Sequence, residues 1–345
     1  MIRILLLLCL TLLTALWSAE RLTALVTGIT DPFATAITAD GTLYVASMAG
    51  NQVLRIGADG KAVPVVGTGA KGMDGLGGPG MKAQLNGPHH LVIAPDGALL
   101  IADTFNCRVL RYDPASGIVS GFLGTGTKGF AGDGGPAIAA QTSDAYCLAL
   151  DAKAKRLYLA DIQNRRIRAV DLTTGMISTF AGTGKKGVPA DGAKASESPL
   201  SDPRAVAVGD DGRLWIIERD GHCLRVVDSD GTIRTVAGTG QKGNGGDGDA
   251  LTIAMNGPKH LWVDRDGSVL IADCENHLIR RYLPKEGRMV RIVGTGKAGG
   301  NAPEAPLATA LKRPHGVYID ATGGLLISDS ENNRVLLMGA SPPRP

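Results

Sequence analysis

A unit of 55 to 58 residues occurs six times along this chain, and it constrains the fold more than any other feature. One landmark position precedes the first apolar run of every unit; it is occupied by Pro32, Pro88, Ala145, Pro203, Pro258 and Pro314. A unit of this length cannot bury both of its faces alone, so recurring units must pack against one another. The sequence therefore predicts a repeat architecture.

Each unit contains four short apolar runs separated by turn-forming residues. In the second unit the runs are His90–Ala94, Leu99–Ala102, Val109–Tyr112 and Ile118–Leu123. Runs of this length, rich in aliphatic and β-branched residues and bounded by Pro, Asp and Gly, indicate strands. Six antiparallel four-stranded meanders predict an all-β fold, a six-bladed β-propeller.

The two ends of the chain predict that the ring is closed. The sixth unit stops after its third run, Arg334–Met338, and lacks a fourth. The segment Leu22–Gly28 resembles the fourth runs of other units, such as Ile177–Gly184. An unpaired sheet edge would be left without it. We therefore predict that the N-terminal strand completes the last blade, within a propeller spanning residues 22–339.

Residues 1–19 are expected to be a signal peptide. Arg3 precedes the apolar run Ile4–Leu16, and Ser18 and Ala19 are small enough to offer a cleavage site. An uncleaved anchor is the alternative, but the run is short for a membrane span. The sequence thus predicts a secreted or periplasmic protein, a monomer, with residues 340–345 as a C-terminal tail.

Charge and composition exclude one class of partner. The chain has 36 Lys and Arg against 33 Asp and Glu, and only 4% of its residues are aromatic. It contains no run of cations interleaved with aromatic residues. Nucleic-acid binding is therefore not expected.

Four cysteines follow the predicted cleavage site: Cys107, Cys147, Cys223 and Cys274. They form no CxxC pair, which argues against a zinc cluster of thiolates. Two interpretations stay open. Cys107–Cys147 and Cys223–Cys274 are candidate disulfides between neighbouring blades, or all four are unpaired small hydrophobic residues.

Glycine-rich connectors follow the fourth run of five units, as in Gly124–Gly129, and match the pattern GxGxxG. A dinucleotide site needs this pattern between a strand and a helix of a parallel unit. Here it follows an antiparallel meander and recurs five times. We interpret these glycines as a means of reaching positive φ where the chain crosses to the next blade.

An acidic residue ends the second run of five units: Asp103, Asp161, Glu218, Asp273 and Asp329. Its regular recurrence predicts a structural role, in which the carboxylate accepts backbone N–H bonds and orders the following loop. Arg108, Arg166 and Arg334 lie five residues later and are expected to pair with it.

The repeated pattern resembles the NHL repeat. Its features are a leading Pro, an apolar run, a Gly turn, Ala-Asp at the end of the second run and Asn shortly afterwards; the fifth unit spells Asn276-His277-Leu278. The resemblance covers Thr30 to Met338 and implies a six-bladed propeller. Unit one departs most, with Ser47 where Asp is usual.

Function is expected where the units differ. The position after the landmark holds Phe33, His89, Tyr146, Arg204, Lys259 and His315. The next position holds Ala34, His90, Cys147, Ala205, His260 and Gly316. Because the innermost strands line the channel of a propeller, these side chains should converge at one of its mouths. The candidate ligand-binding residues are His89, His90, Tyr146, Arg204, Lys259, His260 and His315.

Two functions compete for this cluster. Arg204 and Lys259, with the imidazoles, favour a binding module for a small polar or anionic ligand, or for a protein partner at the rim. The alternative is a metal-dependent lyase or lactonase. Pro88-His89 and Pro314-His315 resemble a step that supplies metal-binding histidines in peptide-amidating lyases, which implies a divalent metal, Zn or Ca, at His89 and His315. The purely structural explanation is that these polar residues fill a hydrated channel and bind ordered water.

Overall fold

The computed structural model describes residues 21–339. The expected signal peptide and C-terminal tail lie outside the described residues. In the described range, no helix has the length and apolar character needed to cross a bilayer.

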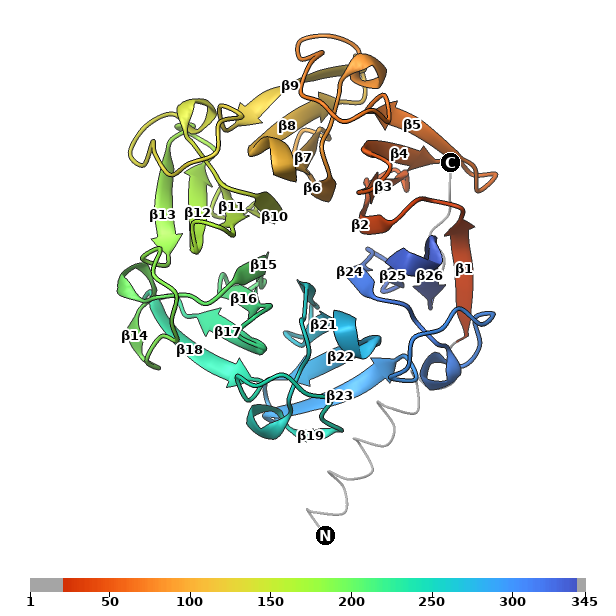
Figure 1. Ribbon diagram of the computed structural model, residues 1–345, viewed down its shortest axis with the longest axis vertical. Coiled ribbons are helices and arrows are strands. Elements are labelled where there is room, and N and C mark those ends of the chain that lie inside the picture. The colour runs from red at the N-terminus through yellow and green to blue at the C-terminus, as the bar shows by residue number, and fades with distance from the viewer. Residues whose placement is uncertain (1–20, 340–345) are drawn as a thin grey trace.

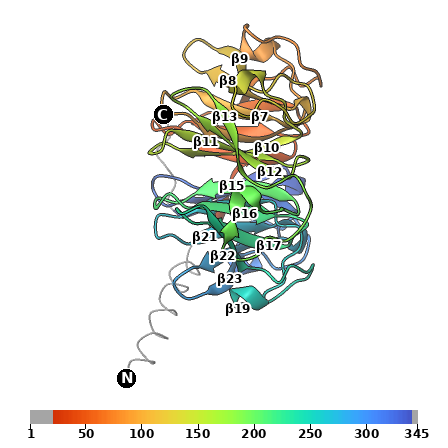
Figure 2. The same ribbon diagram turned by 90° about the vertical axis from the view of Figure 1, so that its left-hand side faces the viewer.

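Six antiparallel sheets stand radially around one axis (Figure 1), which confirms the predicted propeller. Figure 2 shows the same ring edge-on. From the axis outward, the first three blades are β2 (Pro32–Ile37), β3 (Leu43–Ser47), β4 (Gln52–Ile56) and β5 (Ala62–Val66); β6 (Pro88–Ile93), β7 (Leu99–Asp103), β8 (Arg108–Asp113) and β9 (Ile118–Leu123); and β10 (Ala145–Asp151), β11 (Arg156–Asp161), β12 (Arg166–Asp171) and β13 (Ile177–Ala181).

The other three blades follow the same plan. They are β15 (Pro203–Val208), β16 (Leu214–Glu218), β17 (Cys223–Val227) and β18 (Thr232–Ala237); β20 (His260–Val263), β21 (Val269–Asp273), β22 (Leu278–Leu283) and β23 (Arg288–Val293); and β24 (Pro314–Ile319), β25 (Leu325–Asp329), β26 (Arg334–Met338) and β1 (Leu22–Thr27). Two-residue strands, β14 (Ala193–Lys194) and β19 (Gly248–Asp249), add a fifth member outside β18 and β23.

Short 3₁₀ helices occupy the connectors and the turns after second strands. They are η1 (Gly80–Lys82), η2 (Thr104–Asn106), η3 (Ala137–Ala139), η4 (Ala195–Glu197), η5 (Ala250–Thr252), η6 (Cys274–Asn276), η7 (Pro306–Ala308) and η8 (Ser330–Asn332). The connector glycines are structural, as expected. Gly124 has φ +89°, and a Cβ there would meet the carbonyl oxygen of Cys107 at 2.6 Å.

The N-terminal strand closes the ring. β1 pairs antiparallel with β26, from Leu22 opposite Met338 to Thr27 opposite Arg334. Leu22 and Val26 are buried in the last blade. The sixth sheet is thus built from both ends of the described chain, and the two ends meet beside each other in Figure 1.

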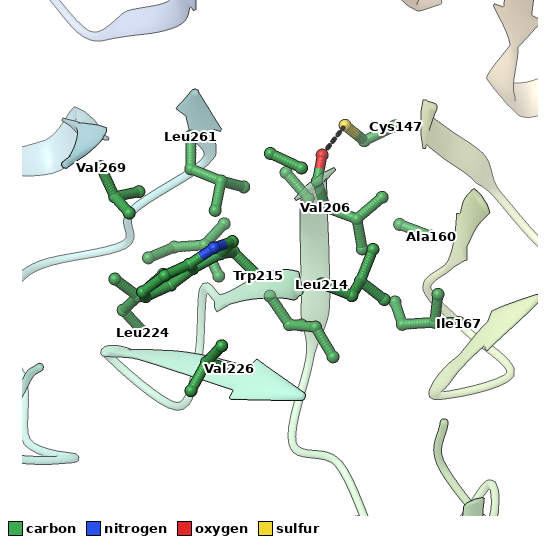
Figure 3. Packing of buried hydrophobic residues seen from close by; sticks show 14 of the residues in the cluster. Cys147, Ala160, Ile167, Val206, Leu214, Trp215, Leu224, Val226, Leu261 and Val269 are labelled. Carbon is green, nitrogen blue, oxygen red and sulfur yellow. Dashed lines mark hydrogen bonds between the residues drawn. The ribbon is translucent and has the colours of Figure 1, made fainter. Parts of the chain in front are cut away.

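Aliphatic side chains fill the space between neighbouring blades, because each strand presents alternate residues to either side. Trp215 on β16 is 1% exposed and packs against Leu224, Leu261 and Val269 of its own and the next blade (Figure 3). Its ring meets that of Tyr282 edge-on, with centroids 6.0 Å apart. The core is therefore a ring of interblade layers.

The recurrent acidic residue has the structural role that the sequence predicts. Asp103 accepts bonds from the backbone N–H of Asn86, from Asn106 and from Arg108 at 2.7 Å. One expected pairing is wrong: in the third blade Asp161 faces Arg168, two residues further along the strand than Arg166. Arg166, the first residue of β12, instead donates to the carbonyl oxygen of Thr183 and lies over the ring of Phe130.

The residue directly before the third strand of each blade adopts positive φ, and in several blades it ties that blade to the next. Its side chain there accepts a backbone N–H from the following blade. Examples are His222, which accepts from Gly257, and His277, which accepts from Arg313. Both histidines are half-buried caps.

The four cysteines of the described chain are buried free thiols, so neither candidate disulfide is formed. Each thiol faces a partner of another kind. The Cys147 thiol donates to the carbonyl oxygen of Val206 at 3.6 Å, which Figure 3 shows as a dashed line. The Cys223 thiol lies 3.8 Å from a carboxylate oxygen of Glu218.

Candidate functional site

A β-bulge at the start of the innermost strands aims side chains at the axis. The pairing register shifts directly after the landmark residue in β2, β6, β10, β15 and β24. A bulge leaves a residue unpaired and redirects its side chain. The residues at this point are Phe33, His89, Tyr146, Arg204 and His315, with Lys259 at the same place in the fifth blade.

These side chains meet at one end of the channel, around a cavity of about 470 Å³ that we term the polar mouth. Its walls are Asp31, Phe33, Met48, His89, Arg204, Lys259, Lys312, Arg313, His315, Ser330, Glu331 and Asn333. Four of the seven candidate residues therefore line one cavity: His89, Arg204, Lys259 and His315. The fifth, Tyr146, lies against two of them.

Aromatic rings stack around the floor of the polar mouth. The imidazole of His315 lies on the ring of Phe33, with centroids 3.9 Å apart and an interplanar angle of 20°. Phe33 meets His89 edge-on at 4.8 Å, and His89 contacts Tyr146 at 4.4 Å. The guanidinium of Arg204 lies 3.7 Å from the centroid of the Tyr146 ring, a cation–π contact. These contacts fix the orientation of each polar group.

Three of the four cations in the polar mouth are already paired. Lys259 lies 3.2 Å from Glu275, and Arg313 bridges Glu275 at 2.7 Å and Glu331 at 2.8 Å. Lys312 lies 3.6 Å from Glu331.

Arg204 differs from these three cations. Within residues 21–339 it forms no ion pair, and the nearby carboxylate of Asp202 pairs with Arg219 at 2.7 Å instead. Its buried Nε atom has no hydrogen-bond partner. Arg204 is therefore the cation whose charge remains available to a ligand.

The histidines of the polar mouth are neutral near pH 7. Burial, together with the charge of Arg204, lowers the pKa of His89 to about 3. Burial and the neighbouring Lys259 hold the pKa of His315 well below its usual value. Lys259 Nζ lies 3.0 Å from His315 Nε2, which accepts from it. The positive charge of the site thus comes from Arg and Lys, and the imidazoles supply hydrogen bonds.

One carboxyl group of the polar mouth titrates close to neutrality. Burial and the charge of Glu331 raise the pKa of Asp31 from 3.8 to about 6, although Arg313 and Lys259 act in the opposite direction. The charge of the cavity therefore changes between pH 5 and 7.

The second column of candidate residues does not line the polar mouth. His90 and His260 come from opposite blades and meet across the channel, with their Nε2 atoms 2.7 Å apart. Cys147 lies beside them, and the three ligand atoms lie within 4.8 Å of one another. We expected all seven candidates at one mouth. His90 lies one residue beyond the bulge of β6, and His260 holds the equivalent place in the fifth blade, so both point into the channel at a deeper level.

Beyond this pair the channel contains an apolar cavity of about 250 Å³, which we term the funnel. Inner-strand residues of all six blades line it, among them Ile37, Ile93, Trp262 and Tyr318, and His90 and His260 form part of its wall. Trp262 is half-buried, with its ring centroid 4.5 Å from that of Tyr318.

The geometry defines a six-bladed propeller whose channel contains two cavities, the polar mouth and the funnel. Comparison with known proteins also finds propeller proteins. Residues 136–244 match the teneurin NHL domain, and residues 311–336 match the NHL repeat. The chain is 25% identical over 283 residues to the protein SUPPRESSOR OF QUENCHING 1, chloroplastic, of Arabidopsis thaliana, covering 79% of this chain and 27% of that protein. It is 29% identical over 209 residues to NHL repeat-containing protein 2 of Bos taurus, covering 52% and 29%.

Solved structures of low sequence identity share the fold. An auxiliary nutrient binding protein from Bacteroides ovatus superposes with a TM-score of 0.68 at 14% identity, covering 93% of this chain and 76% of that one. A gluconolactonase from Xanthomonas campestris gives 0.61 at 14%, with coverages of 94% and 90%. Virginiamycin B lyase from Staphylococcus aureus gives 0.54 at 13%, with coverages of 93% and 99%.

The six blades make this chain a β-propeller, and two of its segments are similar to NHL-repeat domains. It spans less than a third of either relative described above. The fold serves binding proteins and enzymes alike, so function must be argued from the channel itself.

Proposed function

We propose that the protein is a binding module, and that its polar mouth holds a small ligand carrying a carboxylate, phosphate or sulfate group. The observation that carries this proposal is Arg204. Its guanidinium is oriented by the ring of Tyr146, its Nε atom is buried without a partner, and the acidic groups around it pair with other cations. A guanidinium so oriented presents paired N–H groups to an oxyanion.

The rest of the cavity supports the same ligand class. Arg204, Lys259, Lys312 and Arg313 face the carboxylates of Asp31, Glu331 and, behind them, Glu275. The cations exceed the acids by one when Asp31 is ionised and by two when it is protonated. A volume of about 470 Å³ is within the usual range for small-molecule sites. The rings of Phe33 and His315 offer an apolar surface to the remainder of the ligand.

The alternative, a metal-dependent lyase or lactonase acting from His89 and His315, has less support. The Nδ1 atom of His89 lies 2.7 Å from the carbonyl oxygen of Gly87, and Nε2 of His315 accepts from Lys259. A metal would compete with a lysine ammonium for that nitrogen. Calcium is less suited still, because it prefers oxygen ligands. A full equivalent of metal that is lost on His89→Ala would favour the lyase or lactonase over the binding module.

Calorimetric titration with sulfate, phosphate and citrate at low ionic strength tests the binding proposal. Arg204→Met keeps a long side chain over Tyr146 but removes the charge. Loss of charge-assisted hydrogen bonds, worth about 1.5–3 kcal/mol, predicts an affinity about 10- to 150-fold lower. Arg166→Met is the matched control, since Arg166 also lies over an aromatic ring, 3.8 Å from the Phe130 centroid, but outside the channel. Anion binding that is absent in the wild type, or equal in the wild type and Arg204→Met, would refute the proposal.

We further propose that the protein acts outside the cytoplasm, in the periplasm or the extracellular medium. The support is the apolar segment Ile4–Leu16 behind Arg3, with the small residues Ser18 and Ala19 after it. N-terminal sequencing of protein from fractionated cells tests this. We expect a mature chain that begins after Ala19, in the periplasm or the medium; an intact N-terminus in the cytoplasm would contradict it.

A further inference from the structure

His90, Cys147 and His260 form a buried cluster that the binding proposal does not use. They lie on three different blades, and their side chains are almost fully excluded from solvent. The two imidazoles span the channel between the polar mouth and the funnel. In the part of the chain that the structure describes, no other set of three histidine, cysteine or acidic side chains brings its ligand atoms this close together.

As a pair of neutral rings, the two imidazoles cannot satisfy all of their contacts at the same time, because any choice of tautomers leaves at least one N–H facing another N–H. Nδ1 of His90 accepts the backbone N–H of Leu148, and Nδ1 of His260 accepts that of Val317, both at 3.3 Å. A neutral imidazole whose Nδ1 accepts carries its proton on Nε2. Both Nε2 protons would then point at each other across 2.7 Å.

An additional proton does not relieve this conflict, because it would occupy an Nδ1 atom that faces a backbone N–H and would leave both Nε2 protons in place. A cation bound by both Nε2 atoms relieves the conflict between them, and the ring protons then move to the Nδ1 atoms. The hydrogen bonds from Leu148 and Val317 are lost, and the Nε2 atoms move apart from 2.7 Å to about 3.3 Å, as two metal–nitrogen bonds of about 2.0 Å at a tetrahedral angle require.

We propose that His90 Nε2, His260 Nε2 and Cys147 Sγ bind a transition metal ion that accepts thiolate, Zn²⁺ or Cu⁺. On binding, the thiol releases one proton to solvent and forms a metal–sulfur bond, and each neutral imidazole keeps one proton, on Nδ1. Two imidazoles and a thiolate are ligands that both ions prefer. With Cu⁺ the complex has no net charge, and with Zn²⁺ it carries one positive charge.

The cluster differs in composition from its neighbour in the polar mouth. There Cys274 Sγ lies 3.8 Å from His315 Nε2, but the third group is the ammonium of Lys259, which repels a metal ion. Within residues 21–339 the thiol of Cys147 bonds to no lysine or arginine, although the charge of Arg204 acts on it, and it donates to the carbonyl oxygens of Leu148 and Val206.

The metal's remaining coordination position would open into the funnel. His90 and His260 line that cavity, whereas Cys147 does not. The thiolate therefore closes the site on one side, and the two imidazoles present the metal to the apolar cavity. Three protein ligands with one open position are typical of zinc sites that bind a further small molecule.

Titration of the metal-free protein with Co²⁺, as a probe for Zn²⁺, tests the site. We expect one equivalent to bind and a thiolate-to-cobalt charge-transfer absorption to appear. Cys147→Ser should abolish this absorption and weaken affinity by more than about 100-fold, beyond the loss expected for a residue that only supports a ligand. Cys223→Ser and Cys274→Ser, which also alter buried thiols, should retain both. Parallel titrations with Zn²⁺ and with Cu⁺ held by a competing chelator show which ion binds tighter.

A measurement on the wild-type protein keeps the test independent of how the variants fold. X-ray absorption at the metal edge should show two nitrogen neighbours at about 2.0 Å and one sulfur at about 2.3 Å when Zn²⁺ is bound. Failure to bind one equivalent of any of the three ions, absence of a sulfur neighbour, or binding unaffected by Cys147→Ser would overturn the proposal. Failure of sulfate binding at Arg204 would refute the binding module and leave this site untouched.

Discussion

Asp31 offers a quantitative test of the electrostatics of the polar mouth. Burial and Glu331 raise its pKa from 3.8 to about 6, a shift of about two units. Two units correspond to about 3 kcal/mol for a fully buried group. Asp31 is only half-buried, so solvent screening reduces this to about 1–2 kcal/mol. The perturbation that isolates this free energy is Asp31→Asn.

The sign of the effect follows from the direction of the shift. Because the folded-state pKa of Asp31 lies above the unfolded value, its contribution to stability is complete below pH 3.8 and is lost as pH rises through 6. Asparagine stays neutral throughout. We therefore expect the gain in unfolding free energy on Asp31→Asn to be larger at pH 8 than at pH 4 by about 1–2 kcal/mol.

Urea unfolding followed by the fluorescence of Trp215 and Trp262 measures this difference. Asp31 has φ +49°, a conformation that asparagine adopts readily, so substitution also changes the backbone preference. That contribution is the same at both pH values and cancels when the two are subtracted. Sulfate affinity should fall as pH rises from 5 to 8 in the wild type and stay constant in Asp31→Asn. An equal gain in stability at pH 4 and pH 8 would refute the reasoning.

Three further substitutions test the scaffold, each by urea unfolding. Arg280→Leu removes the ion-pair partner of the buried Asp273 carboxylate, 2.6 Å away, and should lower the free energy of unfolding by about 3–5 kcal/mol. A loss below about 1 kcal/mol would show that this ion pair contributes little to stability. Leu22→Ala should cost about 2–5 kcal/mol because β1 is part of the last blade, whereas exposed Thr27→Ala should cost far less, and equal losses would contradict ring closure. Gly316→Ala would press a Cβ against the carbonyl oxygen of Phe33 and should therefore lower both the free energy of unfolding and the sulfate affinity. If neither changes, the inner strands can shift to make room for the added methyl group.

The sequence predicted the ring and its closure because both depend on patterns that survive without coordinates. The repeat period sets the number of blades, and Leu22–Gly28 supplies the strand that the sixth unit lacks. The convergence of His89, Arg204 and His315 followed from their equivalent places in the repeat. Equivalent positions in a closed ring face the same axis, so their proximity needs no further information.

The sequence could not predict which level of the channel each side chain reaches. The bulge separates His89 from His90 and sends them to different cavities, and a bulge leaves little trace in an apolar pattern. The free thiols, the neutral histidines and the pairing of Asp161 with Arg168 likewise depend on distances of a few Å between blades. Such distances are set by packing and not by the repeat.

The location of a bound anion tests the central claim most directly. Crystals grown with selenate, whose selenium can be located by anomalous scattering, would show where a tetrahedral dianion binds. We expect a strong peak in the polar mouth within hydrogen-bond distance of the Arg204 guanidinium, and its loss in Arg204→Met. Peaks confined to the outer surface, or a channel peak that persists in Arg204→Met, would contradict the account.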